Sequence, residues 1–248
     1  MLVIVKENYG EVSTEAAAQI ASLVREKPDC VLGFATGGTP LGTYKELIRL
    51  HREEGLDFSK VTTFNLDEYV GLPPSHPKSY HYYMQENLFN HINVDPRNMF
   101  IPMGMAEDVH GFCAWYEEKI EKVGGIDLQI LGIGANGHIA FNEPGSSLGS
   151  RTRIKTLSEK TIRDNRRFFA KQEEVPRYAI TMGVGTIMEA RQLLLVASGA
   201  TKADAIRATV EGPITAWYPA TIVQMHRFAT IVIDKDAASG LRGNYAGF

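Results

Sequence analysis

Residues 126–134 read Ile-Asp-Leu-Gln-Ile-Leu-Gly-Ile-Gly, and they decide the fold class. A short, nearly continuous apolar run of this kind is typical of a buried β-strand. The run Ile126–Ile133 is the clearest such strand in the chain, and Gly134 ends it. A helical pattern over Val109–Val123 precedes it. A strand that follows a helix and ends in a glycine-rich loop indicates an α/β protein.

The same alternation of strand and helix extends in both directions along the chain. Strands are expected over Leu2–Val5, Cys30–Ala35, Val61–Asn65, Tyr178–Met182, Gln192–Ala197 and Ala229–Asp234. Helices are expected over Ser13–Lys27 (capped by Ser13), Pro40–Glu54 (ended by Gly55), Ser79–His91, Glu159–Phe169 and Thr201–Val210. The stretch LDEYVGLPPSHPKSY, residues 66–80, is expected to be mostly loop. This order predicts one α/β domain over residues 1–248 with a largely parallel sheet, and such sheets bind ligands at the carboxyl ends of their strands.

The composition limits the classes of function. With 44% hydrophobic and 22% charged residues in 248, the chain has the make-up of an ordinary globular protein. No apolar stretch is long enough for a membrane helix, and the N-terminus lacks the pattern of a secretory leader. We therefore expect a soluble cytoplasmic protein that binds no membrane. The net charge of -3 argues against nucleic acid as a partner, and the two cysteines, Cys30 and Cys113, are expected to be buried thiols.

The first motif after a strand is the loop Thr36-Gly37-Gly38-Thr39. Glycines let the backbone approach a ligand, and the amides at the start of the following helix favour an anion. The two threonines add hydroxyl donors, so the loop suits a phosphate group. It is not a nucleotide P-loop, because no Gly-Lys-Ser/Thr follows. The alternative is a tight turn in which Thr39 only caps the helix.

The second motif is Asn65-Leu66-Asp67-Glu68. A carboxylate just after a strand can act as a general base. Adjacent side chains in an extended segment point in opposite directions, so at most one of the two should face the site. The alternative is that both are surface charges.

The third motif is the glycine-rich stretch 131–145, LGIGANGHIAFNEPG. Gly132, Gly134 and Gly137 match a dinucleotide fingerprint in spacing, but Pro144 interrupts the helix that should follow. The region that should supply an acid for the ribose contains Arg151, Arg153 and Lys155 instead, so nicotinamide binding is disfavoured. What remains is a bend that carries Asn136, His138 and Glu143.

His138 is the residue in this bend that suits proton transfer near neutral pH. A carboxylate bonded to one ring nitrogen would fix its tautomer, and amides of the bend could hold developing oxygen charge. A metal site at His138 and Glu143 lacks a third ligand at recognisable spacing, so no metal is expected. A purely structural histidine stays open as an alternative.

The fourth motif is Ser198-Gly199-Ala200-Thr201-Lys202, which again follows a strand. Lys202 could neutralise a phosphate, and Arg166 and Arg167 lie in the charged helix before it. Each of these cations could instead be simply solvated.

These segments together resemble the glucosamine-6-phosphate deaminase family over nearly the whole chain. The resemblance rests on ATGGTP, NLDEYVGL, HPKSY, LGIGANGHIAFNEPG, SRTRIKTL, YAITMGVGTIM and SGATKADA, in that order. It implies a Rossmann-like α/β fold whose open, largely parallel sheet is sandwiched by helices, with neither metal nor other cofactor. The implied reaction converts glucosamine 6-phosphate and water to fructose 6-phosphate and ammonia, and so hydrolyses a carbon–nitrogen bond.

The resemblance also implies residue roles. Asp67 matches the base that moves a proton from C2 to C1, His138 the residue that opens the sugar ring, Glu143 its carboxylate partner, and Asn136 a member of the same cluster. Thr36, Gly37, Gly38, Thr39, Arg167 and Lys202 match the phosphate site. Residues from about Ser158 to Val175 match a mobile lid.

One departure concerns regulation. Hexameric members of the family have an activator site that Ser150, Arg153 and Lys155 match in part. The chain ends at Phe248 without the extension of those members, so we expect weak or no activation and favour a monomer over a hexamer. Two rivals remain: a sugar-phosphate lactonase on the same fold, against which Asn142-Glu143-Pro144 argues, and a non-catalytic sugar-phosphate sensor.

Overall fold

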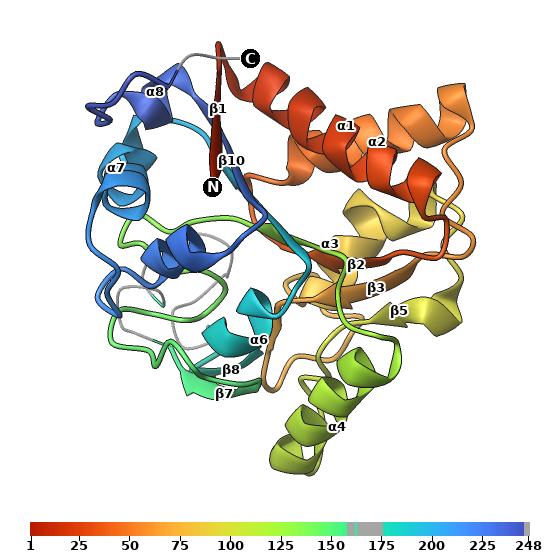
Figure 1. Cartoon of the computed structure of the whole chain (residues 1–248). Coiled ribbons are helices and arrows are strands. Elements are labelled where there is room, and N and C mark those ends of the chain that lie inside the picture. Colours follow the sequence, from red (N-terminus) through yellow and green to blue (C-terminus); the bar gives the residue numbers. More distant parts are fainter. Residues whose placement is uncertain (158–161, 163–175, 246–248) are drawn as a thin grey trace.

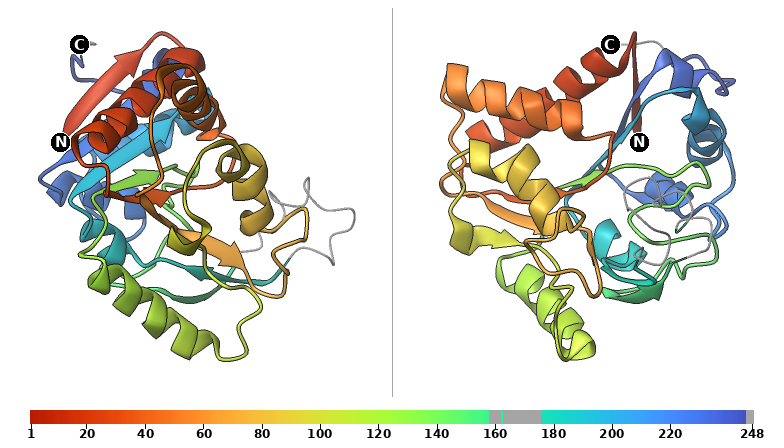
Figure 2. Two further views of the ribbon diagram at one scale, coloured as in Figure 1. Left: turned by 90° about the vertical axis from the view of Figure 1, so that its right-hand side faces the viewer. Right: turned by 180° about the vertical axis from the view of Figure 1, so that it is seen from behind.

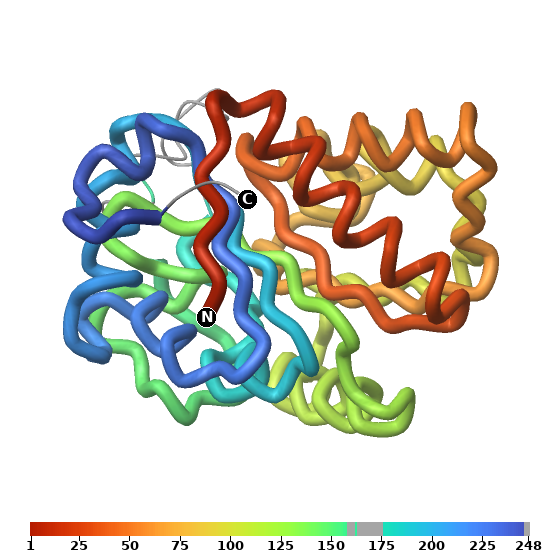
Figure 3. Tube along the Cα trace, turned by 45° about the horizontal axis from the view of Figure 1, so that its top comes forward, coloured from red at the N-terminus to blue at the C-terminus, as the bar shows by residue number. Residues whose placement is uncertain are grey.

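A seven-stranded parallel sheet forms the centre of the protein, in the order β1-β10-β9-β6-β2-β3-β5. The computed structural model describes residues 1–157, 162 and 176–245. The strands of this sheet are β1 Leu2–Lys6, β2 Val31–Phe34, β3 Thr62–Asn65, β5 Met99–Phe100, β6 Leu128–Leu131, β9 Gln192–Ala197 and β10 Ala229–Asp234. β1 lies beside β10, so the first and last strands of the chain are neighbours at one edge of the sheet (Figure 3). The predicted α/β fold with a largely parallel sheet is confirmed.

Helices cover both faces of this sheet (Figures 1 and 2). The α-helices are α1 Tyr9–Glu26, α2 Leu41–Glu54, α3 Tyr80–Asn87, α4 Val109–Lys122, α6 Val184–Met188, α7 Ala203–Glu211 and α8 Lys235–Ala238. The 3₁₀ turns are η1 Phe89–His91, η2 Pro96–Asn98, η5 Ala200–Lys202 and η6 Pro219–Met225. Helices α1, α2 and α3 share one hydrophobic cluster with the sheet, whereas α4, α6, α7 and α8 share the other.

The central strands supply both clusters because their side chains alternate between the two faces. In β9, Leu193 and Leu195 belong to the cluster under α4 and α7, while Leu194 and Val196 belong to the cluster under α1 and α2. Burial on both faces explains why these strands are nearly continuous apolar runs in the sequence.

A second, three-stranded antiparallel sheet has the order β4-β8-β7, with β4 Asp67–Tyr69, β7 Arg153–Thr156 and β8 Tyr178–Thr181. Its strands come from segments far apart in the chain, and β4 follows β3 of the large sheet after a single residue. The small sheet therefore fixes the backbone at Asp67, immediately beyond the carboxyl end of β3.

Several sequence predictions need correction. Residues 66–80 are mostly loop, as expected, but the short strand β4 within them was not predicted, and neither were β5 and β7. Ser13 does not cap α1: the helix begins earlier, Asn8 caps it, and the Ser13 hydroxyl donates to the Tyr9 carbonyl at 2.8 Å. Apart from residue 162, the helix expected over Glu159–Phe169 lies outside the described residues. The other expected strands and helices are confirmed, with ends that shift by a few residues.

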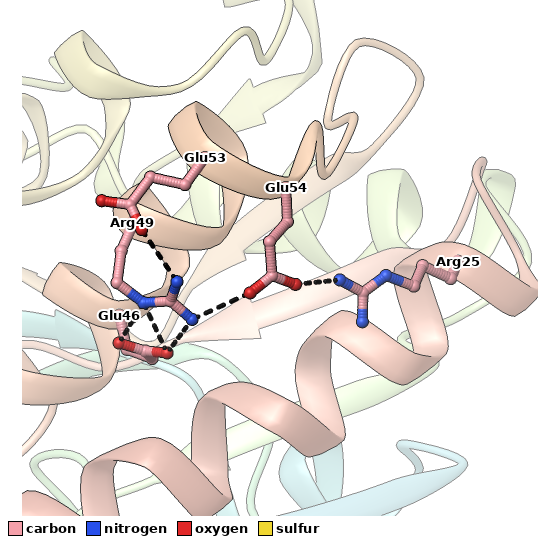
Figure 4. Close-up of polar contacts among 5 residues, drawn as sticks. All are labelled: Arg25, Glu46, Arg49, Glu53 and Glu54. Carbon is pink, nitrogen blue, oxygen red and sulfur yellow. Dashed lines mark hydrogen bonds and ion pairs between the residues drawn. The ribbon is translucent and has the colours of Figure 1, made fainter.

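Helices α1 and α2 are also joined at their solvent-exposed ends (Figure 4). Arg49 binds Glu46, Glu53 and Glu54, and Glu54 binds Arg25 of α1 at 3.0 Å. Exposed ion pairs of this kind contribute little individually. The network sits toward the C-terminal end of α2, opposite the loop that precedes this helix.

The strand order reverses direction between β2 and β6. From β2 the chain builds outward through β3 and β5, and from β6 it builds the other way through β9 and β10. A crevice at the carboxyl ends of the strands flanking such a switch point is the usual ligand site of an open parallel sheet. Among the described helices, none is both long and apolar enough to cross a bilayer.

Candidate active site

A cavity of about 1120 Å³ opens at this switch point. Its walls come from the segments that follow β2, β3, β6 and β9, together with the start of α3. The residues predicted for chemistry that line it are Thr36, Gly37, Gly38, Thr39, Asp67, His138 and Lys202. The four motifs, separated by up to 166 residues from Thr36 to Lys202, therefore meet at one place.

Tyrosine hydroxyls bind backbone carbonyl groups of the loop Thr36–Thr39. The Tyr83 hydroxyl donates to the Gly37 carbonyl at 2.6 Å, and the Tyr9 hydroxyl lies 3.2 Å from the carbonyl oxygen of Gly38. Gly37 has φ of 100°, a conformation that favours glycine. Within the described part of the chain, no group accepts a hydrogen bond from the backbone amides of this loop.

Helix α2 begins directly after this loop. Pro40 occupies the N-cap position without a side-chain cap, so Thr39 does not cap the helix. In the first turn of α2 the Gly42 amide donates to the Tyr9 hydroxyl at 2.7 Å, so the unbonded amides are those of the loop before the helix. Amides in that place, with the positive end of the helix dipole behind them, suit an anion. This geometry favours a phosphate site at Thr36–Thr39 over a tight turn in which Thr39 only caps the helix.

Lys202 approaches the same cavity from the end of β9. Its Nζ donates to the carbonyl oxygen of Ile133 at 2.7 Å, which places the ammonium group between the β9 loop and the glycine-rich bend. Asp234 holds the preceding turn by accepting from the Gly199 amide at 3.0 Å and from the Ser198 hydroxyl. Arg167, the other predicted phosphate ligand, lies outside the described residues.

Asp67 is buried in the wall of the cavity, with 6% of its surface exposed. Burial raises the pKa of its carboxyl group from 3.8 to about 8, and the negative charge of Glu68 adds to this rise. A carboxylate with this pKa is a much stronger base than an exposed aspartate.

Glu68 points away from Asp67, as the alternation of an extended segment predicts. It is 1% exposed and accepts hydrogen bonds from the backbone amides of Tyr69, Tyr80 and His81 at 2.8–3.0 Å. Its Oε2 also lies 3.1 Å from Nδ1 of His81. Glu68 therefore anchors β4 to the first turn of α3, and only one of the two carboxylates faces the cavity.

The bend after β6 brings His138, Asn136 and Glu143 together. The Asn136 amide stands between the other two: its Nδ2 donates to Glu143 Oε2 at 2.8 Å, and its Oδ1 lies 2.6 Å from His138 Nδ1. The nearest Glu143 oxygen is 3.8 Å from His138 Nδ1. The expected direct carboxylate–histidine hydrogen bond is thus replaced by a contact through Asn136.

This chain of contacts assigns the histidine tautomer. A carboxylate only accepts hydrogen bonds, so the Asn136 NH₂ must face Glu143 and its carbonyl oxygen must face His138. Nδ1 of His138 then carries the proton. In the neutral ring Nε2 is left as an acceptor, which is what a proton-transfer residue requires.

The glycines of the bend allow His138 to fold over the backbone. A Cβ at Gly134 would lie 2.2 Å from Cε1 of the His138 ring, so no larger residue fits there. The amides of Gly134 and Gly137 donate to carbonyls within the bend at 2.9 Å. The prediction that amides of this bend hold developing oxygen charge is therefore wrong for these two groups, because they are already bonded.

An aromatic wall beside Asp67 was not predicted. It consists of Tyr69, Tyr80 and Phe141, with the rings of Tyr80 and Phe141 stacked at a centroid distance of 6.1 Å. The Tyr80 and Tyr69 hydroxyls are 3.4 Å apart, and burial raises the pKa of Tyr80. The wall explains much of the desolvation of Asp67. The aromatic residues in DEYVGL and KSYHYY were the signal available in the sequence.

The residues predicted for an activator site lie elsewhere. Ser150 accepts a hydrogen bond from the Val184 amide at 3.1 Å through its hydroxyl, and Arg153 and Lys155 lie on β7. Arg153 donates to the carbonyl oxygen of Arg151 at 3.2 Å. None of the three lines the cavity, so their role stays a prediction.

Comparison with known proteins gives one consistent result. Residues 6–232 match the family described as glucosamine-6-phosphate isomerases/6-phosphogluconolactonase. The chain is 56% identical to the glucosamine-6-phosphate deaminase of Thermoanaerobacter sp. strain X514, over 96% of this chain and 94% of the relative. It is 53% identical to that of Clostridium perfringens strain 13, over 98% of this chain and 100% of the relative.

Solved structures agree. A monomeric glucosamine-6-phosphate deaminase superposes with a TM-score of 0.95 at 48% identity, covering 97% of this chain and 100% of that structure. A 6-phosphogluconolactonase from Trypanosoma brucei superposes with a TM-score of 0.74 at 20% identity, covering 97% and 98% of the two chains. The second similarity concerns the fold alone.

Proposed function

Because the chain belongs to the family of glucosamine-6-phosphate isomerases and 6-phosphogluconolactonases, we propose that it is a glucosamine-6-phosphate deaminase. It converts glucosamine 6-phosphate and water to fructose 6-phosphate and ammonia. The observation that carries this proposal is the pairing, in one cavity, of a buried Asp67 with the bend that presents His138. Relatives more than 50% identical over nearly the whole chain carry the same enzyme name.

The first step is opening of the pyranose ring. The hydroxyl on C1 gives its proton to Nε2 of His138, the bond between C1 and the ring oxygen breaks, and the ring oxygen receives a proton. The histidine returns the proton that it took, so one residue serves both transfers. Asn136 and Glu143 support this role by keeping the proton of the neutral ring on Nδ1.

The second step is transfer of a proton from C2 to C1. In the open aldehyde the C2 proton is acidic, because the electron pair left behind forms the C1–C2 double bond of an enol while the carbonyl oxygen takes a proton from the substrate's own ammonium group. Asp67 takes that proton and delivers it to C1, which leaves an imine at C2. Water adds to the imine carbon and ammonia leaves, giving the ketose.

The phosphate group is held away from the reacting carbons by the loop Thr36–Thr39 and Lys202, with Arg167 as a further ligand. Binding energy from a remote group serves orientation at the reacting centre. The residues from about Ser158 to Val175 act as a lid in this proposal, and nearly all of that segment lies outside the described residues.

The test of the proposal is ammonia release from glucosamine 6-phosphate by purified protein without added metal or cofactor. Fructose 6-phosphate is measured in the same samples, and equal amounts of the two products are expected. The two rivals are tested alongside. Hydrolysis of 6-phosphogluconolactone without ammonia release would identify a lactonase, and binding of glucosamine 6-phosphate without turnover would identify a sensor.

A monomer that N-acetylglucosamine 6-phosphate does not activate is the second part of the proposal. The similarity to a monomeric deaminase at 48% identity supports it. We expect a single species near 27.5 kDa in sedimentation and an unchanged, hyperbolic rate curve when the activator is added. A hexamer, or a sigmoidal curve that the activator makes hyperbolic, would overturn this part and give Ser150, Arg153 and Lys155 a regulatory role.

The raised pKa of Asp67 predicts how the reaction rate depends on pH. The base must be ionised, so kcat/KM should fall as the pH drops below about 8, with a slope of one proton. The corresponding acidic limb of the kcat profile, where the rate falls with pH, should occur at a lower pH than that of kcat/KM. The reason is that the ammonium group of the bound substrate favours the ionised carboxylate. Steady-state rates between pH 5.5 and 9.5 measure both limbs.

Glu68→Gln provides the control for that profile. It removes the neighbouring negative charge that raises the pKa of Asp67, so the limb of kcat/KM should move to lower pH. Ionisations of the substrate itself cannot move in this variant. An unchanged limb in a folded Glu68→Gln protein would assign it to the substrate instead of Asp67.

A further inference from the structure

The two segments proposed to carry the chemistry, Leu66–Asp67 and His138–Glu143, are both attached to the end of β8. On one side, β8 pairs antiparallel with β4, and Asp67 stands opposite Thr181 in the register. The amide of Met182 then donates to the carbonyl oxygen of Leu66 at 2.7 Å. The backbone that carries the base is therefore fixed by Thr181 and its neighbour.

On the other side, the same two residues hold the turn after His138. The backbone amide of Phe141 donates to the Thr181 hydroxyl oxygen at 3.1 Å, and Asn142 Nδ2 donates to the Met182 carbonyl oxygen at 2.9 Å. The turn needs such support, because Ala140 has φ of 51° and is the one non-glycine among the described residues with positive φ. That backbone conformation is unfavourable for a residue with a Cβ.

Thr181 itself is fully buried and does not line the cavity. Its hydroxyl is the acceptor for a buried amide, and loss of that acceptor would leave the Phe141 amide unsatisfied. Among the described residues, the hydroxyl hydrogen-bonds only to the Phe141 amide and the Met182 carbonyl oxygen. It can therefore affect the reaction only by setting the position of the turn that carries His138 and Glu143.

We propose that Thr181 is a positioning residue: its hydroxyl sets the turn that carries His138 and Glu143 relative to Asp67, and so aligns ring opening with proton transfer at C2. This inference rests on the proposed deaminase function. Displacement of a reacting group by about 1 Å can lower a rate by about 100-fold. The loop Thr36–Thr39, proposed to hold the phosphate group, follows β2, and neither printed hydrogen bond of the Thr181 hydroxyl reaches it, so substrate binding should be spared.

The test compares Thr181→Val, which keeps the shape and removes the hydroxyl, with Thr181→Ser, which keeps the hydroxyl. For Thr181→Val we expect kcat to fall about 10- to 100-fold with KM within about threefold of wild type. Thr181→Ser should recover most of kcat. The matched control is Thr186→Val, another buried threonine, whose hydroxyl donates to Glu117 at 2.6 Å and which does not line the cavity.

Thermal unfolding of each variant separates positioning from stability, and rates are measured well below the transition. Thr186→Val is expected to lose stability while its kcat stays at the wild-type value. If Thr181→Val does not fold, Thr181→Ser and Thr181→Cys form a second pair of equal shape, in which the thiol is the weaker acceptor. The cysteine variant should then have the lower kcat.

Two results would overturn the proposal: a kcat for folded Thr181→Val equal to wild type, or equal rates for the serine and cysteine variants. These are distinct from failure of the proposed function. If wild-type protein releases no ammonia, the deaminase assignment fails before any variant is compared. If it does release ammonia and the variants behave alike, only the positioning role is lost.

Discussion

Replacing Asp67 by asparagine is expected to lower kcat for ammonia release by about 10³- to 10⁴-fold. Asparagine has nearly the same shape but cannot accept the C2 proton. Binding of the substrate should persist, because the loop Thr36–Thr39 and Lys202 approach the cavity from other strands. Ammonia release measures the first effect, and calorimetric titration with glucosamine 6-phosphate measures the second. Turnover within tenfold of wild type would remove Asp67 from the role of base.

The same variant should gain stability as it loses activity. The pKa of Asp67 is raised in the folded state, so its contribution to stability is complete below the unfolded pKa of 3.8 and is lost as pH rises through about 8. Asparagine does not titrate. The difference in unfolding free energy between Asp67→Asn and wild type should therefore increase from pH 5 to pH 8.5, by an amount on the order of a few kcal/mol. An equal difference at both values would contradict the raised pKa.

The large sheet could be predicted from the sequence because each of its long strands carries its own signal. Burial on both faces makes Leu193–Val196 and Leu128–Leu131 largely apolar, and a glycine follows each of these two strands within two residues. The small sheet carries no such signal. In β7 two of four residues are cationic, and β4 has three residues, of which two are carboxylates. Their pairing depends on contacts between distant segments, which local periodicity does not contain.

The candidate site was predictable where a side chain is unusual for its place. A histidine among glycines, and a pair of carboxylates after a strand, stand out in any reading of the chain. The residues that hold these side chains in place do not stand out in the sequence. Thr181 is one threonine among many, and its importance comes from the register of β8 against β4. The interposed amide of Asn136 likewise depends on the fold of the bend and not on its composition.

In the proposed mechanism, one part of the site anchors the phosphate group and another part carries the two reacting groups. The phosphate loop and Lys202 extend from the ends of parallel strands, as in other folds that bind at a switch point. Asp67 and His138 instead depend on a second sheet that ties two loops together. This division predicts that variants of the two parts change different constants: KM for the anchor and kcat for the reacting groups.

His138→Gln tests the first step of the reaction separately. Glutamine cannot take up a proton near neutral pH, so ring opening must rely on water, and kcat should fall by about 10²- to 10⁴-fold. The control is His226→Gln, because His226 is buried and its Nε2 faces the Ala190 carbonyl oxygen at 2.8 Å, away from the cavity. This control should keep wild-type kcat at temperatures where it is folded.

The residual activity of His138→Gln should have a particular form, since Asp67 remains intact. If the variant uses substrate that has opened in solution, its rate will rise with enzyme concentration only until spontaneous ring opening becomes limiting. Added imidazole, a general acid–base catalyst, should then raise the rate of His138→Gln and leave Asp67→Asn inactive. A rate that stays proportional to enzyme concentration and ignores imidazole would mean that another group in the cavity opens the ring. The difference between the two variants assigns the two proton transfers to two separate residues.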